Sequence, residues 1–341
     1  MSARKWLAAA GAGLLTLQLV LTAQGYDSAA SWLKELLSTK ELIAASVAVE
    51  LRGFQSSTPA QSHTPAPQTP APLPSIPPAA TPAPSSPSPL PEVLETSVTG
   101  GMTIKNATPF DVSAAQLLAA GPSLILPRDQ PQILIIHTHS SEAYTMDEFD
   151  QYEPSDTSRT QDANYNVIRV GDELTACLQE YGLRVIHDRG VYDYPSYTGS
   201  YNRTAEAIAA YLEQYPSLSM VIDLHRDAIG DDDVVYKTVA EQEGLPSAQA
   251  MLVVGSCGSG LEHPHWEENL RLAAYLQNAV NAVHPSLMRP INLVNERYNQ
   301  QLTTGSLILE VGSSGNTLQE ALTAVRLFAE GVGPALAKQI Q

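Results

Sequence analysis

Apolar and polar positions along residues 96–341 follow two alternating patterns. Short apolar runs, typical of buried strands, alternate with longer stretches whose apolar residues recur at helical spacing. The predicted strands are residues 102–106, 132–137, 183–188, 219–225, 234–240, 250–256 and 306–312. The predicted helices are residues 112–120, 164–182, 203–215, 266–283 and 317–340. This order predicts a single α/β domain with a mixed, largely parallel sheet that helices cover on both faces.

The N-terminal pattern differs, because an almost uncharged apolar run covers residues 6–23. Arg4 and Lys5 precede this run and would hold its N-terminal side in the cytoplasm. Its length lies at the lower limit for crossing a bilayer, and no Ala-x-Ala cleavage site follows it. We therefore predict an uncleaved membrane anchor at residues 1–25 rather than a cleaved signal peptide, with the remainder of the chain exported in either case.

Two further segments separate this anchor from the domain. Residues 26–54 have helical spacing and form a predicted juxtamembrane segment. Residues 55–95 contain mainly Pro, Ser, Thr and Ala, and 13 of the 25 prolines lie between Pro59 and Pro91. Such a composition cannot bury enough apolar surface to fold. We interpret it as a disordered linker that spaces the domain away from the membrane.

Charge and motifs exclude several classes of function. The formal net charge of −17 argues against a nucleic-acid partner, which requires a basic surface. Cys177 and Cys257 lack metal-type spacing, so they are either two free thiols or one disulfide. The chain also lacks a Gly-x-Ser-x-Gly motif, a P-loop and a dinucleotide-binding fingerprint.

Candidate chemistry gathers where three predicted strands end abruptly in polar residues. These strand ends lie in ILIIHTHSSE (133–142), VIDLHRDA (221–228) and SLILEVGSSGN (306–316). Because open α/β sheets build their sites at the carboxyl ends of their strands, we expect these polar residues to meet. Two histidines and a carboxylate are a typical catalytic zinc set that leaves one coordination position open.

We assign His139, Glu142 and His225 as the predicted zinc ligands. His137 and His139 lie two positions apart, so in a continuous strand both would point to the same face. His137 is therefore a residue that supports a ligand, or an alternative ligand. The pattern leaves the choice between His137 and His139 open.

Other residues complete the predicted site. Asp223, two positions before His225, could orient a histidine. Glu310 interrupts an apolar run, where an unpaired carboxylate is costly to bury, and it is the candidate general base. Arg226 or Arg203 could bind an oxyanion or a substrate carboxylate. Tyr201 ends a tyrosine-rich stretch that is either one wall of a substrate groove or an ordered surface loop.

Six segments resemble the stage II sporulation protein P family. They are HTHSSEAYT (137–145), NYNVIRVGDEL (164–174), DYPSYTGSYNRT (193–204), VIDLHRDA (221–228), WEENLRLA (266–273) and TGSLILEVGSSGNTLQEA (304–321). The resemblance extends from about residue 99 to the C-terminus, and the motifs are specific in combination.

The resemblance implies a fold related to the zinc N-acetylmuramoyl-L-alanine amidases. It also implies cleavage of that amide in peptidoglycan, with endopeptidase activity on peptide cross-links, during engulfment of the forespore. Implied partners are stage II sporulation protein D, a lytic transglycosylase, and the membrane protein stage II sporulation protein M. The resemblance places His139, Glu142 and His225 at Zn²⁺ positions and Glu310 at the catalytic glutamate. It implies a membrane-anchored protein whose catalytic domain lies outside the cytoplasm, between mother cell and forespore.

Two alternatives remain compatible with the residues. One is a wall-binding protein that keeps the fold without catalysis and tethers the membrane to peptidoglycan. The other is a zinc peptidase with a different substrate on a similar sheet.

Overall fold

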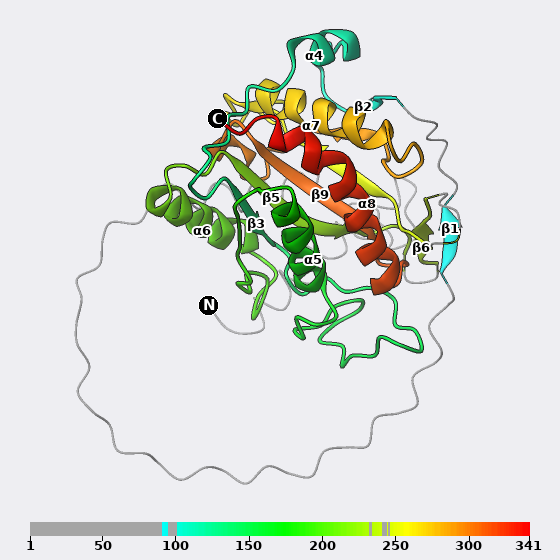
Figure 1. The fold of residues 1–341 in the computed structure, drawn as a ribbon. Coiled ribbons are helices and arrows are strands. Elements are labelled where there is room, and N and C mark those ends of the chain that lie inside the picture. Colours follow the sequence, from blue (N-terminus) through cyan, green and yellow to red (C-terminus); the bar gives the residue numbers. More distant parts are fainter. Residues whose placement is uncertain (1–90, 95–100, 232–233, 241–243, 245) are drawn as a thin grey trace, which may run out of the picture. The chain divides into compact units, whose positions relative to one another are not determined.

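A seven-stranded sheet forms the centre of the computed structural model, which describes residues 91–94, 101–231, 234–240, 244 and 246–341 (Figure 1). The strands, in their order across the sheet, are β2 (Ile104–Asn106), β8 (Ile291–Leu293), β7 (Ala250–Val254), β9 (Ser306–Ser313), β5 (Met220–Asp227), β3 (Ile133–Ile136) and β4 (Val185–His187). All neighbouring pairs are parallel except β7 and β9. The prediction of a mixed, largely parallel sheet is therefore confirmed.

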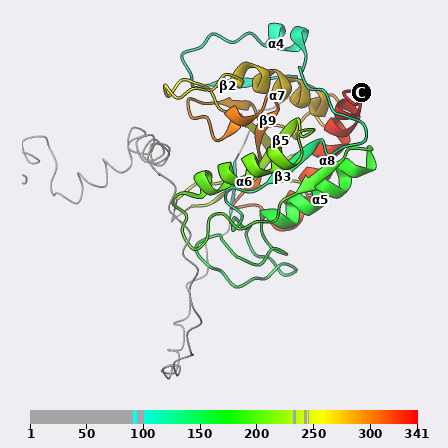
Figure 2. The same cartoon turned by 90° about the vertical axis from the view of Figure 1, so that its left-hand side faces the viewer.

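Helices lie on both faces of this sheet. The larger apolar core packs helices α5 (Val167–Glu180), α7 (Trp266–Asn281) and α8 (Leu318–Ala337) on one face. Helix α6 (Ser200–Gln214) packs over β3 and β5 on the other face. Figure 2 shows β3 and β5 between α6 and α5.

Side-chain alternation along each strand determines which residues face which helices. In β3, Ile133 and Ile135 join the larger core, whereas Leu134 and Ile136 join the core under α6. All four are fully buried. A strand that is buried on both faces has the continuous apolar run from which it was predicted.

Local signals explain several helix boundaries. Asn166 caps α5 by accepting a hydrogen bond from the backbone amide of Ile168, and Gly182, after the helix, has a φ of 79°. Thr317 and Glu320 form a reciprocal capping box at the start of α8. The five predicted helices are thus present, with boundaries shifted by a few residues.

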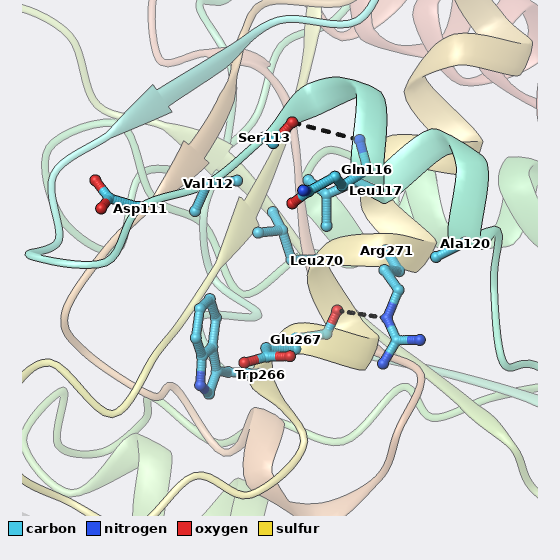
Figure 3. A pocket seen from close by; sticks show the side chains of 10 residues that line it. All are labelled: Asp111, Val112, Ser113, Gln116, Leu117, Ala120, Trp266, Glu267, Leu270 and Arg271. Carbon is cyan, nitrogen blue, oxygen red and sulfur yellow. Dashed lines mark hydrogen bonds between the residues drawn. The ribbon is translucent and has the colours of Figure 1, made fainter.

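Several elements lie at the margins of the domain. Helix α4 (Ala114–Ala120) packs near the N-terminal part of α7, and residues of both helices line a cavity of about 440 Å³ (Figure 3). Strand β1 (Glu92–Leu94), inside the range interpreted as linker, pairs with β6 (Tyr236–Thr238). The short strand β8 and the 3₁₀ helix η2 (Gln300–Leu302) were not predicted.

The anchor, the juxtamembrane segment and the linker up to residue 90 lie outside the described residues. Among the helices that the structure does describe, none is long and apolar enough to cross a bilayer. Cys177 and Cys257 are both free thiols.

Helix α5 approaches two histidines at Gly171. A Cβ atom at this position would lie 2.6 Å from His187 Nε2 and 2.8 Å from His137 Nε2. Both separations are shorter than any contact that real Cβ atoms make. A glycine therefore lets the helix lie directly against the pair His137–His187.

We predict that Gly171→Ala destabilises the fold. Alanine would gain about 1 kcal/mol of helix propensity, but overpacking against two buried rings costs about 1–3 kcal/mol, for a net loss of about 1 kcal/mol. Denaturant unfolding of the variant measures this loss, with Gln179→Ala on the exposed side of the same helix as the control. Unchanged or increased stability of Gly171→Ala would contradict the close approach.

Candidate active site

Three neighbouring strand ends surround one pocket of about 250 Å³. In the register of β5 and β9, His225 lies opposite Glu310. β3 pairs with the other side of β5, and the chain that follows β3 carries His139 and Glu142. Residues that line the pocket include His139, Glu142, Tyr201, His225, Tyr298 and Glu310.

Strand alternation explains why these side chains meet. In β5, Met220, Ile222 and Leu224 enter the larger core, so Asp223 and His225 face the opposite side of the sheet. In β9, Leu307 and Leu309 also enter the larger core, and Glu310 therefore shares the opposite face. The apolar positions of these strands thus determine on which face the polar residues lie.

His225 lies between two carboxylates. Its Nδ1 is 3.3 Å from Glu142 Oε2, and its Nε2 is 2.8 Å from Asp223 Oδ1. The Nε2 contact lacks hydrogen-bond geometry, although both side chains are buried. The backbone amide of Arg226 donates to Glu142 Oε2 over 3.2 Å.

Asp223 joins the ends of β3 and β5. Its Oδ1 accepts a hydrogen bond of 2.8 Å from the backbone amide of Thr138, and its Oδ2 accepts one of 2.6 Å from the Thr138 hydroxyl. Because the same carboxylate contacts the ring of His225, it fixes the segment between β3 and His139 relative to that ring. The orienting role of Asp223 toward a metal ligand stays a prediction.

His139 lies among aromatic rings on the same side of the sheet. Tyr197 stacks on it with ring centroids 4.4 Å apart at 12°. Tyr201 contacts it edge-on at 5.5 Å, and His225 does so at 5.3 Å. Ser200 Oγ lies 3.4 Å from His139 Nδ1. The ring is therefore held by contacts on several sides.

Burial and charge give the three predicted ligands different protonation preferences. Burial lowers the pKa of His139 to about 4, so this imidazole is neutral at pH 7. Burial disfavours the charged forms of His225 and Glu142, but the attraction between these two groups outweighs the effect of burial. Asp223 and Glu142 raise the pKa of His225 well above its usual range, whereas His225 and Arg226 lower the pKa of Glu142. Carboxylates that stabilise the protonated, positively charged form of His225 also stabilise a metal cation. Binding of such a cation would displace the proton from the imidazole.

Glu310 has the opposite environment. Burial raises the pKa of its carboxyl to about 8, against the nearby charge of His225. Its Oε2 atom is buried and has no hydrogen-bond partner among the described residues. A buried acceptor without a partner is costly, and one that faces a pocket is suited to a bound water or substrate group.

His137 does not share a face with His139. β3 ends at Ile136, and the turn that follows takes His139 to the side of Tyr197 while His137 stays on the α5 side. His137 Nδ1 donates to the carbonyl of Leu224 over 2.8 Å, and its Nε2 lies 2.8 Å from His187 Nε2. The expectation of a shared face was wrong because the strand ends before both histidines.

The two predicted substrate-binding arginines contact backbone carbonyls. Arg226 donates to Ala143 and Ser158, and Arg203 donates to Tyr192, Thr198 and Ser196. Arg226 still borders the pocket with its backbone amide bonded to Glu142. Their observed contacts hold loops, and their binding of a substrate stays a prediction.

Sequence reasoning did not single out Arg159, Asp193 or Tyr298, which lie near the pocket. Arg159 lies 3.6 Å from Glu142 Oε1 and 2.9 Å from Asp193 Oδ2. Tyr298 lines the pocket with a φ of 46°, a conformation that a tyrosine rarely adopts. The segments that carry these residues have no strand or helix pattern, so no periodicity indicated them.

His139, Glu142 and His225 are residue types that bind divalent metals, and two of their pairwise separations are compatible with one ion. Two ligand atoms on a tetrahedral zinc with bonds of about 2.0–2.1 Å lie about 3.4 Å apart, and two imidazole centres about 5 Å apart. The separation of Glu142 from His225 is 3.3 Å, and the His139 and His225 ring centres are 5.3 Å apart. As placed, no three His, Cys, Asp or Glu side chains of the described residues converge on one metal position.

The sequence of this domain matches a known protein family. Residues 98–333 match the sequence profile of stage II sporulation protein P. The chain belongs to the stage II sporulation protein P family. The matched range contains every predicted ligand, Asp223 and Glu310.

The chain is also similar to a curated relative and to solved structures. Stage II sporulation protein P of Bacillus subtilis (strain 168) is 27% identical over 217 residues, which cover 59% of this chain and about half of that relative (50%). An N-acetylmuramoyl-L-alanine amidase from Clostridium difficile 630 is 13% identical, with 62% of this chain and 97% of that chain covered at a TM-score of 0.36. The apo form of an N-acetylmuramyl-L-alanine amidase from Mycobacterium abscessus is 13% identical, with 61% and 98% covered at a TM-score of 0.34.

We predict that Thr138→Val destabilises the fold by about 1.5–3 kcal/mol, because one buried Asp223 oxygen loses a hydrogen bond that valine cannot replace. Valine keeps the shape of threonine, so packing changes little. Thr323→Val is the matched control, since its hydroxyl bonds to Gln319 on an exposed face of α8. Denaturant unfolding measures both, and equal losses in the two variants would contradict the importance of the Asp223 contacts.

Proposed function

We propose that this chain is a zinc-dependent hydrolase that cleaves the N-acetylmuramoyl-L-alanine amide of peptidoglycan. One observation carries the proposal: His139, Glu142, His225 and Glu310, which three different strand ends position, line the same pocket. Membership of the stage II sporulation protein P family supports the choice of substrate.

In this proposal His139, Glu142 and His225 hold the ion. His139 supplies a neutral imidazole because burial lowers its pKa to about 4. Asp223 orients His225 from the side opposite Glu142. When bound, a zinc ion supplies Lewis-acid polarisation of a carbonyl, acidifies water and favours the ionised form of nearby Glu310.

Glu310 is the proposed proton shuttle. Its unpaired Oε2 can accept a proton from the attacking water and then donate that proton to the leaving amine. Burial raises the pKa of its carboxyl to about 8, so proton uptake and release near neutral pH are both accessible. The tyrosines Tyr201 and Tyr298 border the pocket and provide surface for the substrate.

We extend the proposal to cellular context on the basis of family membership and the sequence pattern. The segment 1–25 anchors the protein in the membrane, with 26–54 as juxtamembrane segment and 55–95 as linker. The domain 96–341 acts outside the cytoplasm during engulfment, together with stage II sporulation proteins D and M. Cleavage of peptide cross-links is a second activity proposed for the same pocket.

The decisive experiment digests purified peptidoglycan with the full chain and identifies the new chain ends. We expect new L-alanine amino termini, which amide cleavage produces, and their loss after a chelator removes the metal. New ends only within the peptides would indicate an endopeptidase. Metal binding without hydrolysis of peptidoglycan would favour a peptidase of another substrate, and wall binding with neither metal nor new ends would favour an inactive tether.

We predict that Glu310→Gln keeps its zinc but loses activity by about 10²–10⁴-fold, because the variant lacks the proton shuttle. Metal content and release of chain ends are measured on the same preparation. Glu213→Gln, an exposed substitution on α6, is the control and should behave as the wild type. Full hydrolysis by Glu310→Gln would exclude Glu310 as the shuttle.

A further inference from the structure

A guanidinium group that the sequence pattern did not indicate lies at the border of the pocket. Arg159 Nη1 is 2.9 Å from Asp193 Oδ2 and donates to Ser141 Oγ over 3.0 Å. Its Nη2 lies 3.6 Å from Glu142 Oε1. One side chain therefore contacts a predicted ligand, the residue before that ligand, and a carboxylate from another loop.

Backbone pairing fixes the position of Arg159. Thr160 donates its amide to the Ser141 carbonyl over 2.9 Å, and Ala143 donates to the Ser158 carbonyl over 3.0 Å. These two bonds place Arg159 directly opposite Glu142 in an antiparallel bridge. The proximity of the two charges is thus a result of the backbone and not of a long flexible side chain alone.

Asp193 is a buried carboxylate that requires a cationic partner, and Arg159 provides it. The side chain of Asp193 is completely buried, and it accepts hydrogen bonds from the hydroxyls of Ser140 and Ser141. Among the described residues, Arg159 forms its ion pair. A buried carboxylate without a cationic partner is strongly destabilising, so the pair ties the loop around Asp193 to the segment that carries His139 and Glu142.

The same arginine also reaches the ring that covers His139. Its Cζ lies 5.0 Å from the centroid of Tyr197, and Tyr197 stacks on His139 at 4.4 Å. Cation–π contact and aromatic stacking both depend on the position of the ring between them. Arg159 thus contacts Glu142 directly and His139 through Tyr197.

We propose that Arg159 is a positioning residue that holds two of the three metal ligands, Glu142 and His139, in the arrangement that binds the ion. This inference rests on the proposed function, because it assumes that these residues are ligands. Arg203 and Arg226 have a different role, since their guanidinium groups donate hydrogen bonds to backbone carbonyls. Residues that orient metal ligands typically contribute about 10–100-fold to metal affinity.

The test measures binding of Zn²⁺ alone to the purified full chain by competition with a chelating dye, and the absorption spectrum of bound Co²⁺. Arg159→Met should weaken Zn²⁺ binding by about 10–100-fold and change the Co²⁺ spectrum. Arg169→Met is the matched control, because it removes an arginine that pairs with Glu173 at the same 2.9 Å on α5, and its affinity should remain that of the wild type.

A double variant separates positioning from stability. Arg159→Met alone leaves Asp193 buried and unpaired, whereas Arg159→Met with Asp193→Asn leaves no uncompensated charge, so the double variant should recover stability. We expect its Zn²⁺ affinity to stay low. This variant also provides the test if the single variant fails to fold.

The outcomes distinguish this inference from the proposed function. Zn²⁺ affinity in the double variant within about twofold of the wild type would overturn the positioning role, because ligand geometry would then not depend on Arg159. Absence of Zn²⁺ binding by the wild type would instead overturn the proposed zinc hydrolase. Weak binding by both Arg159 variants, with normal binding by Arg169→Met, supports the inference.

Discussion

The site depends on three neighbouring parallel strands, β3, β5 and β9, that end at the same edge of the sheet. Their pairing places His225 opposite Glu310 and brings the chain after β3 to the other side of His225. Apolar residues of β5 and β9 fill the larger core on one face, so the polar residues between them must face the other. The same hydrophobic burial that stabilises the sheet thus concentrates charged groups at one place.

Buried charged groups require oppositely charged partners, and the groups around the pocket differ in whether they have one. His225 contacts both Glu142 and Asp223, and Asp193 pairs with Arg159. Glu310 has no such partner, and burial raises the pKa of its carboxyl to about 8. A paired group can hold an ion, whereas an unpaired group can exchange a proton. This difference in environment supports the different roles that we propose for the two glutamates.

Sequence reasoning predicted the features that have a strong local pattern. The central strands and the five helices follow from apolar periodicity, and the meeting of Glu142, His225 and Glu310 follows from their places at strand ends. The face of His139 could not be predicted, because it depends on whether the strand ends at Ile136 or continues to His139. One position of difference at a strand end changes the face of the next side chain.

Contacts between loops could not be predicted from apolar periodicity. Arg159 and Asp193 are far apart in sequence and lie in segments without periodicity, so only the folded backbone shows that they pair. The same holds for Arg203, whose bonds to loop carbonyls depend on the shape of the loop. Strand β8 was missed as well, whereas β2 and β4, which are equally short, were predicted.

The most direct measurement of the central claim is X-ray absorption at the zinc edge of the full chain loaded with one equivalent of Zn²⁺. Our account predicts a first shell of nitrogen and oxygen only, at about 2.0–2.1 Å, with the scattering of two imidazole rings. A shell that contains sulfur, or one of oxygen atoms without any imidazole, would contradict the convergence of His139, Glu142 and His225 on one ion.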